Sequence, residues 1–201
     1  MIQVSSINAD RIFIPEDFAV PLSHEWPRGK LVPLSESLAA QDFAAVSSSA
    51  DRIRNVFGPT NGWPAETITD AENLADILRH QTEFASRLGF AYGILDCDSG
   101  DYIGCLYIKR IKSREEIDQR KRVFNAQAFF WLSQGSHSES REAETYRHLS
   151  AWLATAWPFH CLAWPGRSVS WEDWKAAETS EPLAQSLGRQ HFERQVLGGR
   201  A

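Results

Sequence analysis

Residues Phe90 to Ser138 carry the clearest fold signal, and their sequence is FAYGILDCDSGDYIGCLYIKRIKSREEIDQRKRVFNAQAFFWLSQGSHS. Its hydrophobic pattern has a period of two, which is typical of strands. The pattern predicts a strand from Phe90 to Asp96, a turn at Asp98-Ser99-Gly100 and a returning strand from Tyr102 to Ile108. A charged connection leads to a third predicted strand from Val123 to Ser133. Three strands joined in this way favour a mostly antiparallel sheet over a doubly wound parallel one.

Two helices are expected before these strands. Apolar residues recur at helical spacing over 43–57, and a capping box formed by Thr69 and Glu72 begins the second helix. We expect the second helix to bury five apolar side chains, namely Leu74, Ile77, Leu78, Phe84 and Leu88. A short edge strand is expected over Lys30–Leu34, because Pro33 has no backbone N–H to donate to a sheet.

A third helix is expected after the long strand. It begins near Ser138, where Ser136 and Glu139 have capping-box spacing, and it ends at Trp157-Pro158. A further strand is predicted over Phe159–Trp164. The strand, helix and strand together predict one parallel pair with a right-handed crossover.

The predicted fold class is therefore α/β of the α+β type, with a mixed, mostly antiparallel central sheet flanked by helices. We divide the chain into an irregular N-terminal arm over residues 1–29, a single domain over 30–175 and a tail over 176–201. The tail is expected to be partly helical or disordered.

The composition fits one folded domain and argues against nucleic-acid binding. The chain has 201 residues, of which 43% are hydrophobic, and a net charge of -5. Binding to nucleic acid requires that phosphate charge be neutralised, and no basic tract with interleaved aromatic residues occurs. The densest basic stretch, Lys109–Arg122, also contains acidic residues, so we expect a solvated hairpin tip there.

Cysteine usage and the lack of long apolar runs suggest a cytoplasmic protein. Cys97, Cys105 and Cys161 are odd in number and widely spaced, which predicts neither a disulfide framework nor a zinc site. No metal-binding motif is found, so no metal cofactor is expected. No run of about 18 apolar residues occurs, which predicts no membrane span. Charged residues such as Asp10 and Arg11 interrupt any apolar run that could serve as a signal peptide.

With this order of elements, residues 31–175 resemble the GNAT superfamily of acyl-CoA-dependent N-acyltransferases. Four short segments are similar to a bacterial subgroup of GNAT-like proteins: Phe57-Gly58-Pro59 with Trp63-Pro64, Phe90-Ala91-Tyr92, Ile103 to Ile108, and Trp164-Pro165-Gly166-Arg167. The resemblance implies a GNAT fold. It also implies that the chain moves an acyl group from acetyl-CoA, or from another acyl-CoA, to the amine of a small molecule.

The resemblance further implies a cofactor-binding turn after the long strand. Backbone N–H groups and the positive end of the next helix attract the cofactor diphosphate in such a turn. The residues assigned to the cofactor in this way are Trp131, Leu132, Ser133, Gln134, Gly135, Ser136, His137 and Ser138. Gly135 follows Gln134 directly, whereas the family usually has two residues between them, and the helix opens with Glu139, Glu142 and Glu144. Simple capping of the helix is the alternative role of this turn.

Acyl transfer benefits from a base whose pKa is near neutrality. The candidate is His160, on the strand after the third helix and close to where the family groove would open; a structural or surface histidine is the alternative. The family's usual tyrosine acid has no counterpart, since no tyrosine follows Tyr146. The closing strand of the sheet would come from the N-terminal arm or from a second subunit, which would make a homodimer.

A different class of function is the main alternative. In that interpretation the chain keeps the GNAT fold, has an altered CoA site and binds a ligand or partner without catalysis. Six of the eight tryptophans lie between Trp131 and Trp174, where they would either line a ligand pocket or fill the core.

Overall fold

The computed structural model describes residues 13–113 and 115–198 and contains one six-stranded sheet. The strands are β1 (His24–Trp26), β2 (Gly29–Pro33), β3 (Gly89–Leu95), β4 (Tyr102–Lys109), β5 (Ala126–Leu132) and β6 (Leu162–Ala163). Their order in the sheet follows their order in the chain. Neighbouring strands are antiparallel except for β5 and β6, which are parallel. The predicted mixed, mostly antiparallel sheet with one parallel pair is confirmed.

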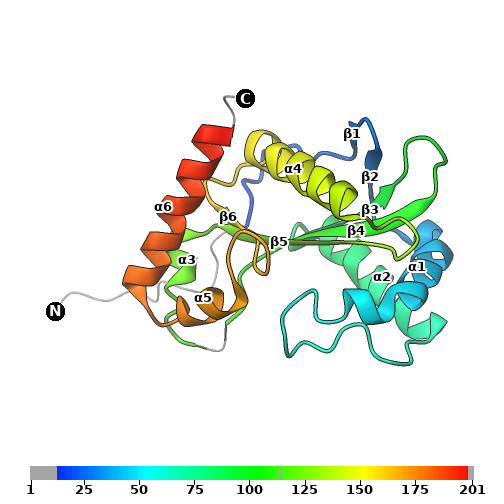
Figure 1. Cartoon of the computed structure of the whole chain (residues 1–201), viewed down its shortest axis with the longest axis horizontal. Coiled ribbons are helices and arrows are strands. Elements are labelled where there is room, and N and C mark those ends of the chain that lie inside the picture. Colours follow the sequence, from blue (N-terminus) through cyan, green and yellow to red (C-terminus); the bar gives the residue numbers. More distant parts are fainter. Residues whose placement is uncertain (1–12, 114, 199–201) are drawn as a thin grey trace.

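Helices cover both faces of the sheet. They are a 3-10 helix η1 (Glu36–Leu38), α1 (Ala39–Ile53), α2 (Asp70–Ala85), α3 (Arg120–Val123), α4 (Glu139–Ala156), α5 (Trp171–Ala176) and α6 (Glu181–Gly198). Figure 1 shows α4 above the sheet, α1 and α2 below it, and α5 and α6 beside β6. None of the described helices has both the length and the apolar character needed to cross a bilayer.

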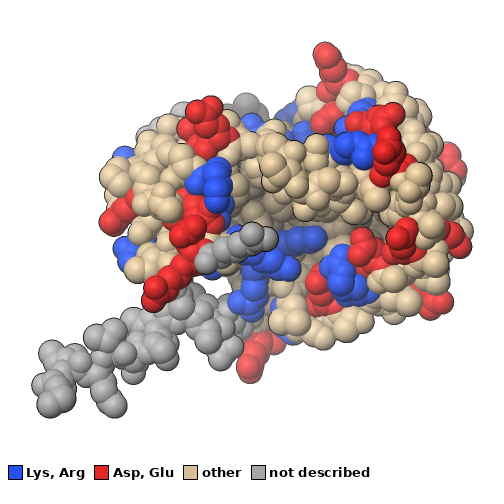
Figure 2. Space-filling view, turned by 90° about the horizontal axis from the view of Figure 1, so that it is seen from below, with Lys and Arg blue, Asp and Glu red and all other residues tan. Residues whose placement is uncertain are grey.

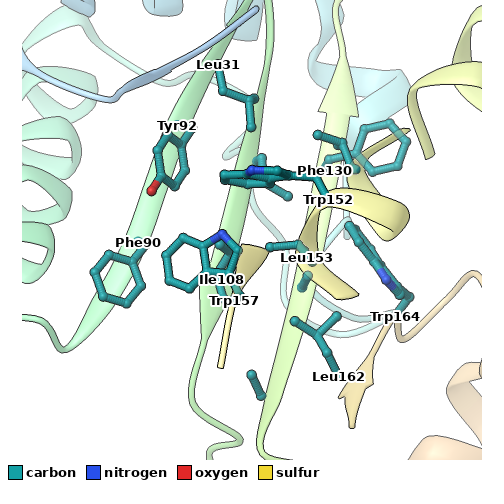
Figure 3. Close-up of a cluster of buried hydrophobic side chains, with 14 of the residues drawn as sticks. Leu31, Phe90, Tyr92, Ile108, Phe130, Trp152, Leu153, Trp157, Leu162 and Trp164 are labelled. Carbon is teal, nitrogen blue, oxygen red and sulfur yellow. The ribbon is translucent and has the colours of Figure 1, made fainter. Parts of the chain in front are cut away.

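The core on the α4 face is rich in aromatic side chains. Figure 3 shows Trp152, Leu153 and Trp157 from α4 and its end packing against side chains of the central strands. Trp157 lies 4.8 Å from Phe90 between ring centroids, and Trp164 packs edge-on against Phe130. Trp152, Trp157 and Trp164 therefore fill the core on this face, where they hold α4 in a defined position on the sheet.

The opposite face of the sheet carries polar groups as well as apolar ones. The capping box predicted for α2 is confirmed, since the Thr69 hydroxyl accepts from the Glu72 amide at 3.2 Å and the Glu72 carboxylate accepts from the Thr69 amide at 2.9 Å. The predicted buried face of α2 is wrong in part. Ile77 is buried as predicted, but Leu78 and Leu88 are 41% and 57% exposed, and the helix buries the polar residues Asn73 and His80 in addition to Ile77. These polar side chains find partners on the helices, since Asn73 donates to the Ala39 carbonyl of α1 at 3.5 Å and the His80 ring contacts Arg79 and Glu83 of α2.

Two details differ from the sequence expectation, and the tail takes the helical one of its two expected forms. His24–Trp26, within the predicted irregular arm, form β1 in a hairpin with β2, and Trp26 is buried. Within the predicted tail, Ala184 and Leu187 of α6 are buried in an apolar cluster, which stabilises a helix of weak sequence signal. The third helix begins with Ser138 rather than Ser136 as its cap, because the Ser138 hydroxyl accepts from the Arg141 amide at 3.2 Å.

The charged connection before β5 is not a solvated tip throughout. Asp118 and Arg120 within it are 4% and 5% exposed. The Arg120 guanidinium donates to the Asp118 carboxylate at 2.7 Å and to the Glu178 carboxylate at 3.0 Å. Lys175 pairs with Glu178 as well, so two cations compensate the two carboxylates, which is why Asp118 and Arg120 can leave water.

Candidate functional site

The eight residues assigned to the cofactor form the end of β5 and the turn into α4. Trp131 and Leu132 belong to β5 and are buried, as is Ser133 just after it. Gln134 to His137 make the turn, and Ser138 caps α4. The structure therefore brings these residues together at the positive end of a long helix, as the sequence predicts.

Several backbone amides of this segment donate hydrogen bonds inside the protein. The Ser133 amide donates to the Ile103 carbonyl at 2.7 Å, and the Ser136 amide donates to the Ser133 carbonyl at 3.0 Å. The Gln134 amide donates to the Ser49 hydroxyl of α1 at 2.8 Å. Among the described residues, the amides of Gly135, His137 and Ser138 have no acceptor. Only these three amides can therefore bind an anion without a rearrangement of the turn.

The Glu142 side chain, one turn into α4, is surrounded by cationic groups. Its carboxylate lies 2.6 Å from the Arg167 guanidinium, 2.6 Å from the His137 ring and 4.0 Å from the Arg52 guanidinium. Burial raises the pKa of Glu142, but Arg167 and His137 lower it more, so that it lies below the ordinary value. One carboxylate thus faces two arginines at the beginning of α4.

Arg52 has spare hydrogen-bonding capacity at this place. Its Nε and Nη2 atoms are buried and have no hydrogen-bond partner among the described residues. Burial lowers the pKa of Arg52, the charge of Glu142 raises it and the charge of Arg167 lowers it again. A cavity of about 480 Å³ adjoins it, lined by residues 47–52 of α1 and by Gln134. A half-buried cation with two buried donors that have no partner, beside a cavity, fits an incoming anion.

The edge of β5 beyond its pairing with β6 is covered by one side chain. The two strands pair at Ala126–Leu162 and Gln127–Ala163. Farther along β5, the Arg167 guanidinium lies 3.8 Å from the centroid of the Phe130 ring and donates to the Phe130 carbonyl at 3.2 Å. Arg167 therefore fills the space in which the two parallel strands separate.

Comparisons with known proteins bear on the fold. No protein-family model and no curated protein matches the chain. Among solved structures, it is similar to a probable acetyltransferase with a TM-score of 0.50 and 12% identity, covering 66% of this chain and 67% of that one. It is also similar to an acetyltransferase from Bordetella pertussis assigned to the GnaT family, with a TM-score of 0.49 and 15% identity, covering 66% of this chain and 71% of that one. The chain therefore shares the fold of a probable acetyltransferase.

His160 does not lie at the same end of the sheet as the turn. It is exposed beside Cys161, whose amide donates to Asn125 at 3.1 Å, just before β5 begins. The turn follows the other end of β5, which at seven residues is about 20 Å long. His160 instead lines a cavity with Gly188 and Arg189 of α6. The geometry separates His160 from the residues assigned to the cofactor.

A titratable cluster between α2 and β4 was missed by the sequence analysis. Arg79 Nη2 lies 3.2 Å from His80 Nε2, and since a guanidinium only donates, Nε2 accepts and the ring proton sits on Nδ1. That proton points to the Glu83 carboxylate at 3.1 Å. Burial, together with the charges of Lys109 and Arg79, lowers the pKa of His80 to about 4, so the ring is neutral at pH 7.

Lys109, at the end of β4, belongs to the same cluster and has a strongly lowered pKa. Its ammonium lies 4.5 Å from the centroid of the Phe57 ring and 4.9 Å from that of Tyr107. Burial, and after it the charge of Arg79, lowers the pKa of Lys109 to about 8. The lowered pKa of Lys109 could not be predicted from the sequence, because it is caused by residues that lie far from Lys109 in the chain.

The stability of the protein is expected to rise with pH because of Lys109. A lysine whose folded pKa is about 8 binds fewer protons than its unfolded form between that value and 10.5, so unfolding becomes harder as pH rises. Relative to Lys109→Met, the wild type should gain about 2 kcal/mol of unfolding free energy between pH ~7.5 and ~9.5. Urea denaturation of both proteins at each pH measures the gain. Parallel pH profiles would show that Lys109 has an ordinary pKa.

In the described part of the chain, no group of three or more His, Cys, Asp or Glu side chains is arranged to hold a metal ion.

Proposed function

We propose that the chain is an N-acyltransferase that moves an acyl group from acyl-CoA to the amine of a small molecule. The proposal is supported by the fold that the chain shares with a probable acetyltransferase and carried by one observation, the buried Arg52 donors that lack an acceptor beside the beginning of α4. A diphosphate is an anion of the size and charge that such donors and a helix N-terminus bind. A cytoplasmic location would suit an enzyme that uses acyl-CoA.

In this proposal the protein contributes mainly by binding and orientation. Arg52, Arg167 and the amides of Gly135, His137 and Ser138 would hold the cofactor diphosphate. The acceptor nitrogen then forms a bond to the thioester carbonyl carbon as the carbon–sulfur bond breaks, and the proton lost by the amine ends on the leaving thiolate or in solvent. Holding two reactants in line can itself supply several kcal/mol of the rate enhancement.

Arg167 has to move for the cofactor to enter. In the ligand-free protein its guanidinium is held by the Phe130 carbonyl and the Glu142 carboxylate. The side chain is 24% exposed, so it can leave without opening the core. A diphosphate would replace Glu142 as its partner, so Glu142 acts as an internal competitor for the cofactor.

Acetyl-CoA binding measured by titration calorimetry tests the site. We expect wild type to bind, and Arg52→Ala to bind about 10-fold or more weakly, because a charge-assisted hydrogen bond contributes about 1.5–3 kcal/mol. Glu142→Gln should bind several-fold more tightly, because the competing charge is gone. Arg147→Ala, which removes an exposed arginine elsewhere on α4, is the matched control and should bind like wild type.

A second candidate function is ligand binding without catalysis, and the internal hydrogen bonds of the turn favour it. The amides of Ser133, Gln134 and Ser136 already donate within the protein, and Arg167 covers the edge of β5. If neither wild type nor Glu142→Gln binds acetyl-CoA at millimolar concentration, the transferase proposal fails and this candidate takes its place. If both bind, release of free thiol from acetyl-CoA with a panel of small amines identifies the acceptor.

A further inference from the structure

A second cavity, of about 800 Å³, lies on the sheet face that α1 and α2 cover. It is bounded by the connection between α1 and α2, the ends of β4 and β5, and α5. Figure 2 shows this side of the molecule from below, with Lys and Arg side chains gathered beside a hollow. Its volume is within the range of small-molecule sites, which is roughly 300–1,000 Å³. The lining combines two kinds of side chain, cationic and aromatic.

The cationic side chains outnumber the acidic ones. The lining includes Lys109, Arg110, Lys112, Arg120 and Lys175 but only one carboxylate, that of Glu172. Arg120 and Lys175 form ion pairs with Glu178 outside the lining. Among the side chains that the structure describes, no carboxylate lies within 4.0 Å of the Lys109 or Lys112 ammonium. Lys109 is half-buried, and the charge of Glu83 acts on it only from a greater distance, whereas Lys112 is exposed to water.

The aromatic side chains form flat walls in the same cavity. The Phe57 and Phe129 rings meet edge-on, with centroids 5.4 Å apart. The Phe129 and Trp171 rings are nearly parallel, at 10°, with centroids 6.1 Å apart. Trp174, on the next turn of α5, also lines the cavity. Flat apolar walls of this kind favour a planar ring over a branched chain.

We propose that this cavity binds a small molecule that combines a planar ring with a carboxylate or phosphate group. The ring would lie against Phe57, Phe129 and Trp171, and the anionic group would face Lys109 and Lys112. A charged group on the ligand would give these lysines an acidic partner at ion-pair distance, which no described carboxylate provides. A polynucleotide fits less well, because the chain as a whole carries a net charge of -5. The inference does not depend on acyl transfer.

Titration calorimetry with three naphthalene compounds tests the cavity without any cofactor. The probes are naphthalene-2-carboxylate, 2-naphthyl phosphate and the neutral naphthalene-2-carboxamide, which keep the ring constant and vary the head group. We expect both anions to bind at least 10-fold more tightly than the carboxamide, and the tighter anion identifies the preferred head group. Equal affinities for all three compounds, or no binding of either anion at millimolar concentration, would overturn the proposal.

Variants place the binding in this cavity. Lys112→Gln changes an exposed side chain and should weaken binding of the preferred anion several-fold, whereas Lys109→Met should weaken it 10-fold or more. Neither should alter the affinity for the carboxamide by much. Lys121→Gln removes an exposed lysine outside the lining and should bind like wild type. Unchanged anion affinity in both Lys109→Met and Lys112→Gln would place the ligand elsewhere and refute the proposal.

One further variant separates this inference from the proposed function. Arg52→Ala should lose acetyl-CoA binding and keep the affinity for the preferred naphthalene anion. If acetyl-CoA fails to bind while the anion does, only the transferase proposal falls. If the anion fails while acetyl-CoA binds, only the cavity proposal falls.

Discussion

Gly104→Ala is expected to lose about 3–5 kcal/mol of unfolding free energy, enough to unfold much of a marginally stable domain. Gly104 lies in β4 opposite Leu132 of β5. A Cβ at this position would lie 2.0 Å from the Trp131 carbonyl oxygen and 3.1 Å from the Leu132 Cα. Both neighbours are backbone of the adjacent strand, which cannot turn aside as a side chain can, so the ladder between β4 and β5 must separate.

Urea denaturation of Gly104→Ala beside Gly135→Ala measures this loss. Gly135 lies in the turn after β5, and a Cβ there would meet nothing within 4 Å. We expect the control to change the unfolding free energy by about 0.5 kcal/mol or less. Equal urea midpoints for the two variants would contradict the prediction, because they would mean that β4 and β5 can accommodate the added methyl group with little loss of unfolding free energy.

The second large effect is expected for Arg120→Met, with a loss of about 3–5 kcal/mol. The Arg120 side chain is 6% exposed, and its partners Asp118 and Glu178 are 0% and 6% exposed. Its Nε also donates to the Asp118 carboxylate at 2.9 Å. Methionine keeps the apolar part of the side chain but leaves the buried Asp118 carboxylate without a cation and Glu178 with only the exposed Lys175, which is why the loss is large.

Two further proteins distinguish the ion network from packing. Arg122→Met, at an exposed position two residues on in the same helix, should stay within about 0.5 kcal/mol of wild type. Adding Asp118→Asn and Glu178→Gln to Arg120→Met should recover part of the loss, because the uncompensated charges are then removed. A triple variant no more stable than Arg120→Met would show that the arginine acts through its packing against Trp174, whose ring centroid lies 4.8 Å from the guanidinium carbon.

The sheet was predictable because its signals are local. A period of two and the Asp98-Ser99-Gly100 turn specify the β3–β4 hairpin, and the two faces of β5 alternate as its sequence does. Phe130 and Leu132 pack on the α4 side, whereas Phe129 and Trp131 pack on the side of α1 and α2. The parallel pairing of β5 with β6 follows from chain connectivity, since a helix between two strands must return the chain.

Elements stabilised by distant contacts were not predictable. α6 has a weak helical signal in its sequence and is stabilised by burial of Ala184 and Leu187. Arg120, in the charged connection before β5, is buried because it pairs with Glu178, which lies 58 residues later in the chain. Local propensity carries no information on either contact.

The position of the turn before α4 was predictable, but its chemistry was not. Gln134 to Ser138 could be placed at a helix beginning from the sequence alone. That Arg52 and Arg167 converge on Glu142 depends on the packing of three separate elements. The basic and aromatic cavity had no sequence signal beyond the tryptophan cluster, two of whose members line it.

The outer strands of the sheet affect how copies of this protein can associate. β1 has three residues and β6 has two. Each therefore exposes few main-chain donors and acceptors to a neighbouring molecule, and an added strand would gain few hydrogen bonds there. An added strand would therefore gain little at β1 or at β6, whereas the part of β5 beyond Gln127 has no neighbouring strand among the described residues and is covered by the Arg167 side chain.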